Sequence, residues 1–84
     1  MARIMVRYWA AARDAAGVAQ EELDAVTLAT ALADVTERRG ERLGAVLARC
    51  AFLVDDEPVG RRDPDSVTLR EGALIEVLPP FAGG

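Results

Sequence analysis

The chain has 84 residues, of which 51% are hydrophobic and 29% are charged, and its formal net charge is −4. This length predicts one small domain, and the high apolar content is typical of a globular chain rather than a disordered one. The acidic balance argues against nonspecific nucleic-acid binding, which requires an excess of cations. No apolar run is long enough to span a membrane or to form a signal peptide, so we expect a cytoplasmic protein without membrane association.

The reactive residue types are few. The chain has no histidine and one cysteine, and all ten of its basic residues are arginine. A single Cys50 forms no internal disulfide, and without histidine neither a zinc site nor a cysteine–histidine pair is expected. We interpret Cys50 as a buried small hydrophobe rather than a sulfur-bearing group, and the run from Asp55 to Glu57 as a solvated turn. We therefore expect no bound metal or cofactor.

The first third of the chain predicts a hairpin interrupted by a short helix. Residues 2–9 alternate, with Ile4, Val6 and Tyr8 on one side and Arg3, Met5, Arg7 and Trp9 on the other. This period of two predicts a strand with one buried face. The alanine-rich segment 10–16 predicts a short helix that stops at Gly17, and residues 18–26 predict a second strand. A short helix between the two strands would let them pair as a hairpin.

The main helix is predicted to start after Thr27, a plausible N-cap. Apolar residues then recur at helical spacing up to Val35, and two arginines precede Gly40, as expected at a helix C-terminus. Further along, the sequence predicts a short helix over 43–49, a central strand over 50–54, a short edge strand near Val59, a turn over 63–66 and a last strand over 73–78 after the tight turn 70–72.

The first and last strands carry the clearest alternation. A small mixed sheet of four or five strands packed on one main helix accounts for the order of elements, with the two terminal strands central and parallel. This α+β architecture is the β-grasp, or ubiquitin-like, fold. We assign residues 1–78 to this domain and residues 79–84 to a flexible tail.

The tail reads Pro79-Pro80-Phe81-Ala82-Gly83-Gly84. The prolines cannot continue a central strand, whereas glycine lacks a Cβ, so the walls of a partner's active site can close around it. Six residues reach at most about 20 Å, enough to enter a deep site. If Gly84 ends the chain, its carboxylate is a chemical handle. Gly83 would leave room for the walls of the partner's site. Phe81 would either anchor the tail on a partner or fold back on the domain.

The sequence resembles the MoaD/ThiS family of sulfur carriers, and it is most similar to the small subunit of molybdopterin synthase. The resemblance rests on the segment 6–17 (VRYWAAARDAAG), on Glu71-Gly72 before an apolar strand, and on the ending 78–84 (LPPFAGG). It covers nearly the whole chain. The double proline before Gly-Gly favours the molybdopterin type, because thiamin-pathway carriers often lack it.

The resemblance implies a carrier rather than a catalyst, with no cofactor of its own. A MoeB-type enzyme would use ATP to adenylate Gly84, and a persulfide sulfur would displace AMP to leave a thiocarboxylate. The tail, including Phe81, Ala82 and Gly83, would then enter the large MoaE-type subunit, in a heterotetramer. There the sulfur would pass to cyclic pyranopterin monophosphate during molybdenum cofactor synthesis.

Partner binding is expected on one face of the two terminal strands. Trp9 and Leu78 are large apolar residues on faces that otherwise carry Arg7 and Glu76, so neighbouring strands would join them into an exposed patch. The resemblance implies the same positions. Val59 is expected to extend the patch. Arg13 would either pair with an acidic partner or be solvated. The family commonly has phenylalanines where this chain has Tyr8-Trp9, and a smaller residue where it has Phe81, which would tune partner choice.

Three other functions stay open at this point. One is a sulfur carrier for cysteine or thiamin synthesis, because those tails also end in Gly-Gly, although the double proline argues against it. The chain would also suit a ubiquitin-like modifier that is conjugated to lysines of other proteins. The fourth reading is a β-grasp interaction module whose tail has no chemical role.

Overall fold

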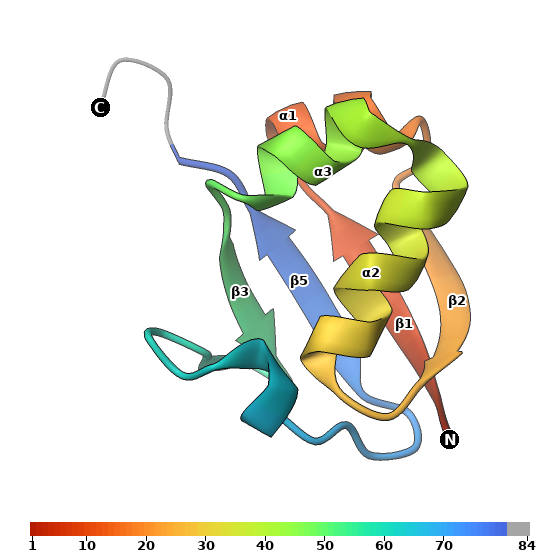
Figure 1. Cartoon of the computed structure of the whole chain (residues 1–84), viewed down its shortest axis with the longest axis vertical. Coiled ribbons are helices and arrows are strands. Elements are labelled where there is room, and N and C mark those ends of the chain that lie inside the picture. Colours follow the sequence, from red (N-terminus) through yellow and green to blue (C-terminus); the bar gives the residue numbers. More distant parts are fainter. Residues whose placement is uncertain (81–84) are drawn as a thin grey trace.

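The structure is a computed structural model that describes residues 1–80, and it consists of one mixed sheet with helices packed on one face (Figure 1). The elements in chain order are β1 (Ala2–Tyr8), α1 (Ala10–Ala16), β2 (Gln20–Ala25), α2 (Leu28–Arg39), α3 (Glu41–Leu47), β3 (Ala51–Val54), β4 (Glu57–Pro58), a 3-10 helix (Pro64–Ser66) and β5 (Leu74–Leu78). The sheet order is β2-β1-β5-β3-β4, so the two terminal strands are central. They run parallel, as predicted, and the other pairings in the sheet are antiparallel.

The β1–α1–β2 unit confirms the predicted hairpin with its helical insert. Helix α1 ends at Gly17, whose φ of 82° places it in the left-handed region that glycine adopts without steric penalty. The second strand is shorter than predicted, because it pairs with β1 only from Gln20 to Ala25. The alternation of β1 buries Ile4, Val6 and Tyr8 and directs the residues between them to the opposite side.

Helix α2 begins where the sequence predicts it. Thr27 and Thr30 form a reciprocal capping box, in which each side chain accepts a hydrogen bond from the backbone N–H of the other residue. Leu28, Ala31 and Val35 are buried against the sheet, as the helical spacing indicates. The short helix α3 follows directly and buries Leu43 and Leu47. The core therefore lies between one face of the sheet and these helices, and the opposite face of the sheet is open.

Residues 51–78 supply the remaining strands of the sheet. The apolar run predicted as a central strand becomes β3, which lies between β5 and the two-residue strand β4. Asp55 and Asp56 connect β3 to β4 with φ values of 50° and 70°, so the predicted solvated turn is a tight hairpin. Within residues 1–80, no helix combines the length and apolar character needed to cross a membrane.

A polar cluster ties β1 and β2 to the end of α2. The Glu21 carboxylate accepts hydrogen bonds from the Tyr8 hydroxyl at 2.5 Å and from Arg39 Nη2 at 2.8 Å, and it lies 3.4 Å from Arg38 Nη1. Its side chain is only 8% exposed. Burial alone would raise the pKa of Glu21, but the hydrogen bonds from Arg39 and Tyr8 and the two guanidinium charges lower it overall. Burial and the bond to Glu21 raise the pKa of Tyr8.

Replacing Glu21 with glutamine is expected to lower the free energy of unfolding at pH 7 by about 1–3 kcal/mol, because the charged acceptor for Tyr8, Arg38 and Arg39 is lost. The pKa of Glu21 is lower in the folded than in the unfolded chain, so its contribution is complete above the unfolded pKa. It is lost as the pH falls through the folded pKa. Urea unfolding at several pH values should therefore show the difference between wild type and Glu21→Gln shrinking below about pH 4.

The control for this prediction is Glu37→Gln, which makes the same charge change at an exposed position of α2. It should change stability by no more than about 0.5 kcal/mol. A Glu21→Gln penalty that is equal at pH 3 and pH 7 would contradict the assignment of this cluster.

Candidate functional site

The tail leaves the domain from the end of β5. The strand ends at Leu78, and Pro79 and Pro80 lead out of the sheet at the end where β1 also ends and α1 begins (Figure 1). The predicted tail residues Phe81, Ala82, Gly83 and Gly84 lie outside the described residues. The candidate site is therefore sought where the two parallel central strands, β1 and β5, end.

The face of the sheet opposite the helices is called here the open face. Its residues follow from the strand register: one row crosses all five strands, through Gln20, Arg7, Glu76, Leu53 and Pro58. A second row on the same face contains Glu22, Met5 and Leu74, and a third, nearest the tail, contains Ala51 and Leu78. The face is thus polar over β2 and, apart from Glu76, apolar over β3 to β5.

Trp9 and Leu78 lie at the tail end of the open face. The Trp9 N–H donates to the Val77 carbonyl at 3.2 Å, which continues the pairing of β1 with β5 and brings Trp9 level with Leu78. The extended backbone of Trp9 also continues the alternation, so its indole projects away from the side on which Tyr8 is buried. Trp9 is 46% exposed, and Leu78 is half-buried. The structure therefore brings together the two residues that the sequence analysis paired.

Arg13 and Val59 have different positions. Arg13 is exposed in the last turn of α1, and its backbone N–H contacts the Trp9 carbonyl, so it lies next to the tryptophan. The prediction that Val59 extends the exposed patch is wrong, because its side chain is 4% exposed and belongs to the core. The Val59 N–H donates to the Phe52 carbonyl, which places both residues on the inner side of the sheet. Pro58, one residue earlier, faces outward instead.

Part of the open face was not predicted from the sequence. Met5, Leu53 and Leu74 add apolar surface, and Arg7 lies across from Glu76 with 3.7 Å between Nη1 and Oε1. The signal for Met5 and Leu74 was present in the alternation of the two terminal strands. Leu53 and the Arg7–Glu76 pair required the register between strands far apart in sequence.

Cys50 does not belong to this surface. Its thiol is partly buried and donates to the Val46 carbonyl at 3.2 Å. Burial raises its pKa, so the reactive thiolate is disfavoured at neutral pH. The structure agrees with a packing role for this residue.

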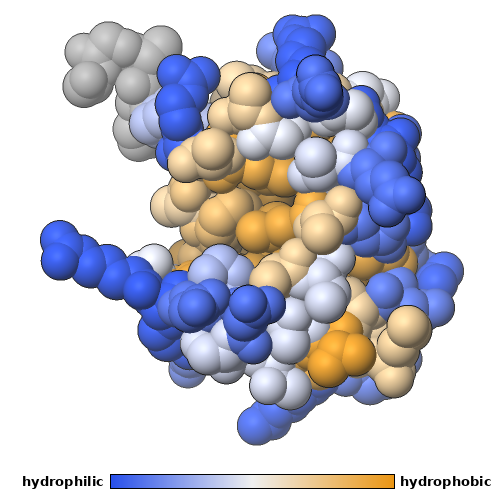
Figure 2. Space-filling model, viewed as in Figure 1, coloured by the Kyte–Doolittle hydropathy of each residue, from blue (hydrophilic) through white to orange (hydrophobic). Residues whose placement is uncertain are grey.

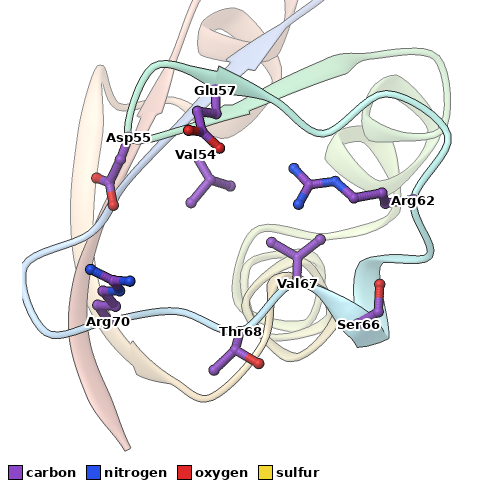
Figure 3. A pocket seen from close by; sticks show the side chains of 8 residues that line it. All are labelled: Val54, Asp55, Glu57, Arg62, Ser66, Val67, Thr68 and Arg70. Atoms are coloured by element: carbon purple, nitrogen blue, oxygen red, sulfur yellow. The ribbon is translucent and has the colours of Figure 1, made fainter.

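Two of the hollows that residues 1–80 form lie away from the open face. One, of about 580 Å³, opens between α2, α3 and β3, and Figure 2 shows apolar side chains gathered on this face. The other, of about 350 Å³, lies at the β3–β4 turn and has mixed charge, with Asp55 and Glu57 along one side and Arg62 and Arg70 across from them (Figure 3). It lies near the start of β5, whereas the tail leaves from the end of that strand, so it is separate from the candidate site.

The mixed five-stranded sheet, with parallel central strands and a helix packed across one face, is the β-grasp fold of ubiquitin-like proteins. The sequence model of the ThiS family matches residues 6–84, and the chain belongs to this family. The family prediction and the fold prediction are both confirmed. No curated protein sequence matches the chain.

Solved structures of several relatives share this fold. Small archaeal modifier protein 1 from Methanosarcina acetivorans is 21% identical with a TM-score of 0.86, covering 100% of this chain and 98% of that one. Subunit 1 of the molybdopterin-converting factor from Helicobacter pylori, solved in complex with subunit 2, is 26% identical with a TM-score of 0.73, covering 98% and 99%. CysO from Mycobacterium tuberculosis is 15% identical with a TM-score of 0.77, covering 93% and 99%.

Proposed function

We propose that this ThiS-family chain is the sulfur-donating small subunit of a molybdopterin synthase. The observation that carries the proposal is the placement of an exposed apolar surface, formed by Trp9, Leu78 and the apolar part of the open face, at the end of the sheet from which the Gly-Gly tail leaves. A partner bound to this surface would receive the tail directly. The complex of the two Helicobacter pylori subunits supports a large subunit as that partner.

The chemistry is confined to the tail. The Gly84 carboxylate attacks the α-phosphate of ATP on a MoeB-type enzyme, pyrophosphate leaves, and an acyl adenylate forms. A persulfide sulfur attacks the acyl carbon and displaces AMP, and a thiol then cleaves the resulting acyl disulfide to leave the thiocarboxylate. In the large subunit this sulfur passes to cyclic pyranopterin monophosphate, and water restores the carboxylate. The domain contributes a rigid docking surface and no acid or base.

Reconstitution tests this assignment to molybdopterin synthesis. The thiocarboxylated chain, mixed with the large subunit from the same organism and cyclic pyranopterin monophosphate, is expected to form molybdopterin. A matched reaction with unmodified chain should form none. If the thiocarboxylated chain supports no molybdopterin formation but supplies sulfur to a cysteine or thiamin synthase, the carrier serves that pathway instead.

A second candidate is a protein modifier, which the likeness in fold to small archaeal modifier protein 1 favours. The same activated glycine would then be attacked by a lysine amine of another protein, with AMP or a thiol as leaving group. Denaturing electrophoresis of a tagged chain expressed in its own organism separates the two. Covalent conjugates that disappear when Gly84 is removed would support the modifier.

A further inference from the structure

Glu76 is a charged residue in the middle of an otherwise apolar part of the open face. Leu74 and Leu78 flank it along β5, Leu53 lies opposite it on β3, and Arg7 lies opposite it on β1. Although the helices pack on the other face of the sheet, these neighbours leave the Glu76 side chain only 16% exposed. An apolar docking surface would be expected to carry a fourth hydrophobic residue here.

The Glu76 carboxylate forms a long ion pair with Arg7, but within residues 1–80 it accepts no hydrogen bond. Its approach to Arg7 is 3.7 Å, which is longer than a hydrogen bond, and Arg7 instead donates through Nε to the Gln20 side chain at 3.3 Å. Among residues 1–80, no donor lies within hydrogen-bonding distance of this carboxylate. In the free protein, water therefore supplies the hydrogen bonds that the carboxylate requires.

A partner that covers the open face removes this water. A carboxylate that is desolvated without a donor costs several kcal/mol, so a purely apolar surface over Leu53, Leu74 and Leu78 would be rejected at Glu76. A surface that offers a cationic donor at this point recovers the loss. Specificity then arises from the difference between the two, because a purely apolar partner removes the water and leaves the Glu76 carboxylate with only the long contact to Arg7 among residues 1–80.

We propose that Glu76 selects the partner, and that the partner's apolar docking surface carries an arginine or lysine side chain that pairs with the Glu76 carboxylate. This inference rests on the proposed function, in which the open face docks on the large subunit of molybdopterin synthase. The cation would lie over β5, and Arg7, on the polar side of the face, would define the edge at which the apolar contact ends. Glu76 is thus a specificity residue about eight positions from the reacting glycine.

Titration calorimetry against the large subunit from the same organism tests this. Glu76→Gln keeps the size of the side chain and removes its charge, and it is expected to weaken binding by about tenfold or more. It should also reduce the dependence of affinity on salt, because one interfacial charge pair is lost. The control Glu37→Gln makes the same charge change on α2 and should bind within about twofold of wild type. Thermal unfolding of each variant checks that the fold is intact.

The outcomes separate the two proposals. If wild type binds tightly and Glu76→Gln binds equally well with the same salt dependence, the role of Glu76 is overturned and the proposed function stands. If wild type does not bind the large subunit, the proposed function fails and this inference fails with it. A second copy of the chain could also cover the open face, with Arg7 of each copy facing Glu76 of the other. Analytical sedimentation tests for this dimer. If the wild-type chain forms a dimer at the concentrations used for binding, and Glu76→Gln dissociates that dimer, the inference is also overturned.

Discussion

A chain extended by one alanine after Gly84 is expected to accept no sulfur while it remains folded. The added residue moves the carboxylate away from the position at which the adenylating enzyme holds the terminal glycine, and its Cβ occupies space that glycine leaves free. Positioning errors of about 1 Å are known to reduce reaction rates about a hundredfold, and one residue moves the carboxylate by about 3.5 Å. We therefore expect activity below detection.

Two assays check this prediction. ATP–pyrophosphate exchange by the adenylating enzyme measures activation, and incorporation of radiolabelled sulfur into the chain measures transfer. The control is an alanine inserted before Met1, because the N-terminus lies at the other end of the molecule from the tail's exit (Figure 1). Sulfur incorporation into the C-terminally extended chain at the wild-type rate would show that Gly84 is not the acceptor.

The second large effect is expected at Trp9. Changing Trp9 to aspartate is predicted to weaken binding to the large subunit by about thirtyfold or more, because a large aromatic anchor is lost and a charge is introduced in its place. The same change should not unfold the domain. Trp9 occupies the N-cap position of α1 without a side-chain capping bond, and aspartate is among the favoured residues at that position.

Val26→Asp is a matched control for Trp9→Asp. Val26 is 50% exposed, close to the 46% of Trp9, and it lies beyond the end of β2 rather than on the open face near the tail. Its change to aspartate should leave binding within about twofold. If both variants lose affinity equally, or if Trp9→Asp lowers the melting temperature enough to unfold the domain, Trp9 does not act as a docking residue.

The strongly periodic parts of the chain were predictable from sequence. The alternation of residues 2–9 and 73–78 identified the two central strands, and the agreement of Thr27, the apolar stripe and Gly40 identified α2. In these segments each local preference points to the same structure, so little is left to tertiary context.

Short segments without their own periodicity were not predictable. Val59 follows a two-residue strand whose register is set by the positive φ values of Asp55 and Asp56, and this register turns Val59 toward the core. A shift of one residue would have placed it on the open face. The Arg7–Glu76 pair depends in the same way on the register of β1 against β5, which are separated by nearly the whole chain.

The intact mass of the chain tests the carrier function most directly. After incubation with a MoeB-type adenylating enzyme, ATP and a persulfide donor, the C-terminal peptide is expected to gain the mass difference between one sulfur and one oxygen, at Gly84. The gain should require ATP and should be absent from a chain that lacks Gly84. An unchanged mass, under conditions in which an established sulfur carrier becomes thiocarboxylated, would contradict a role in sulfur transfer.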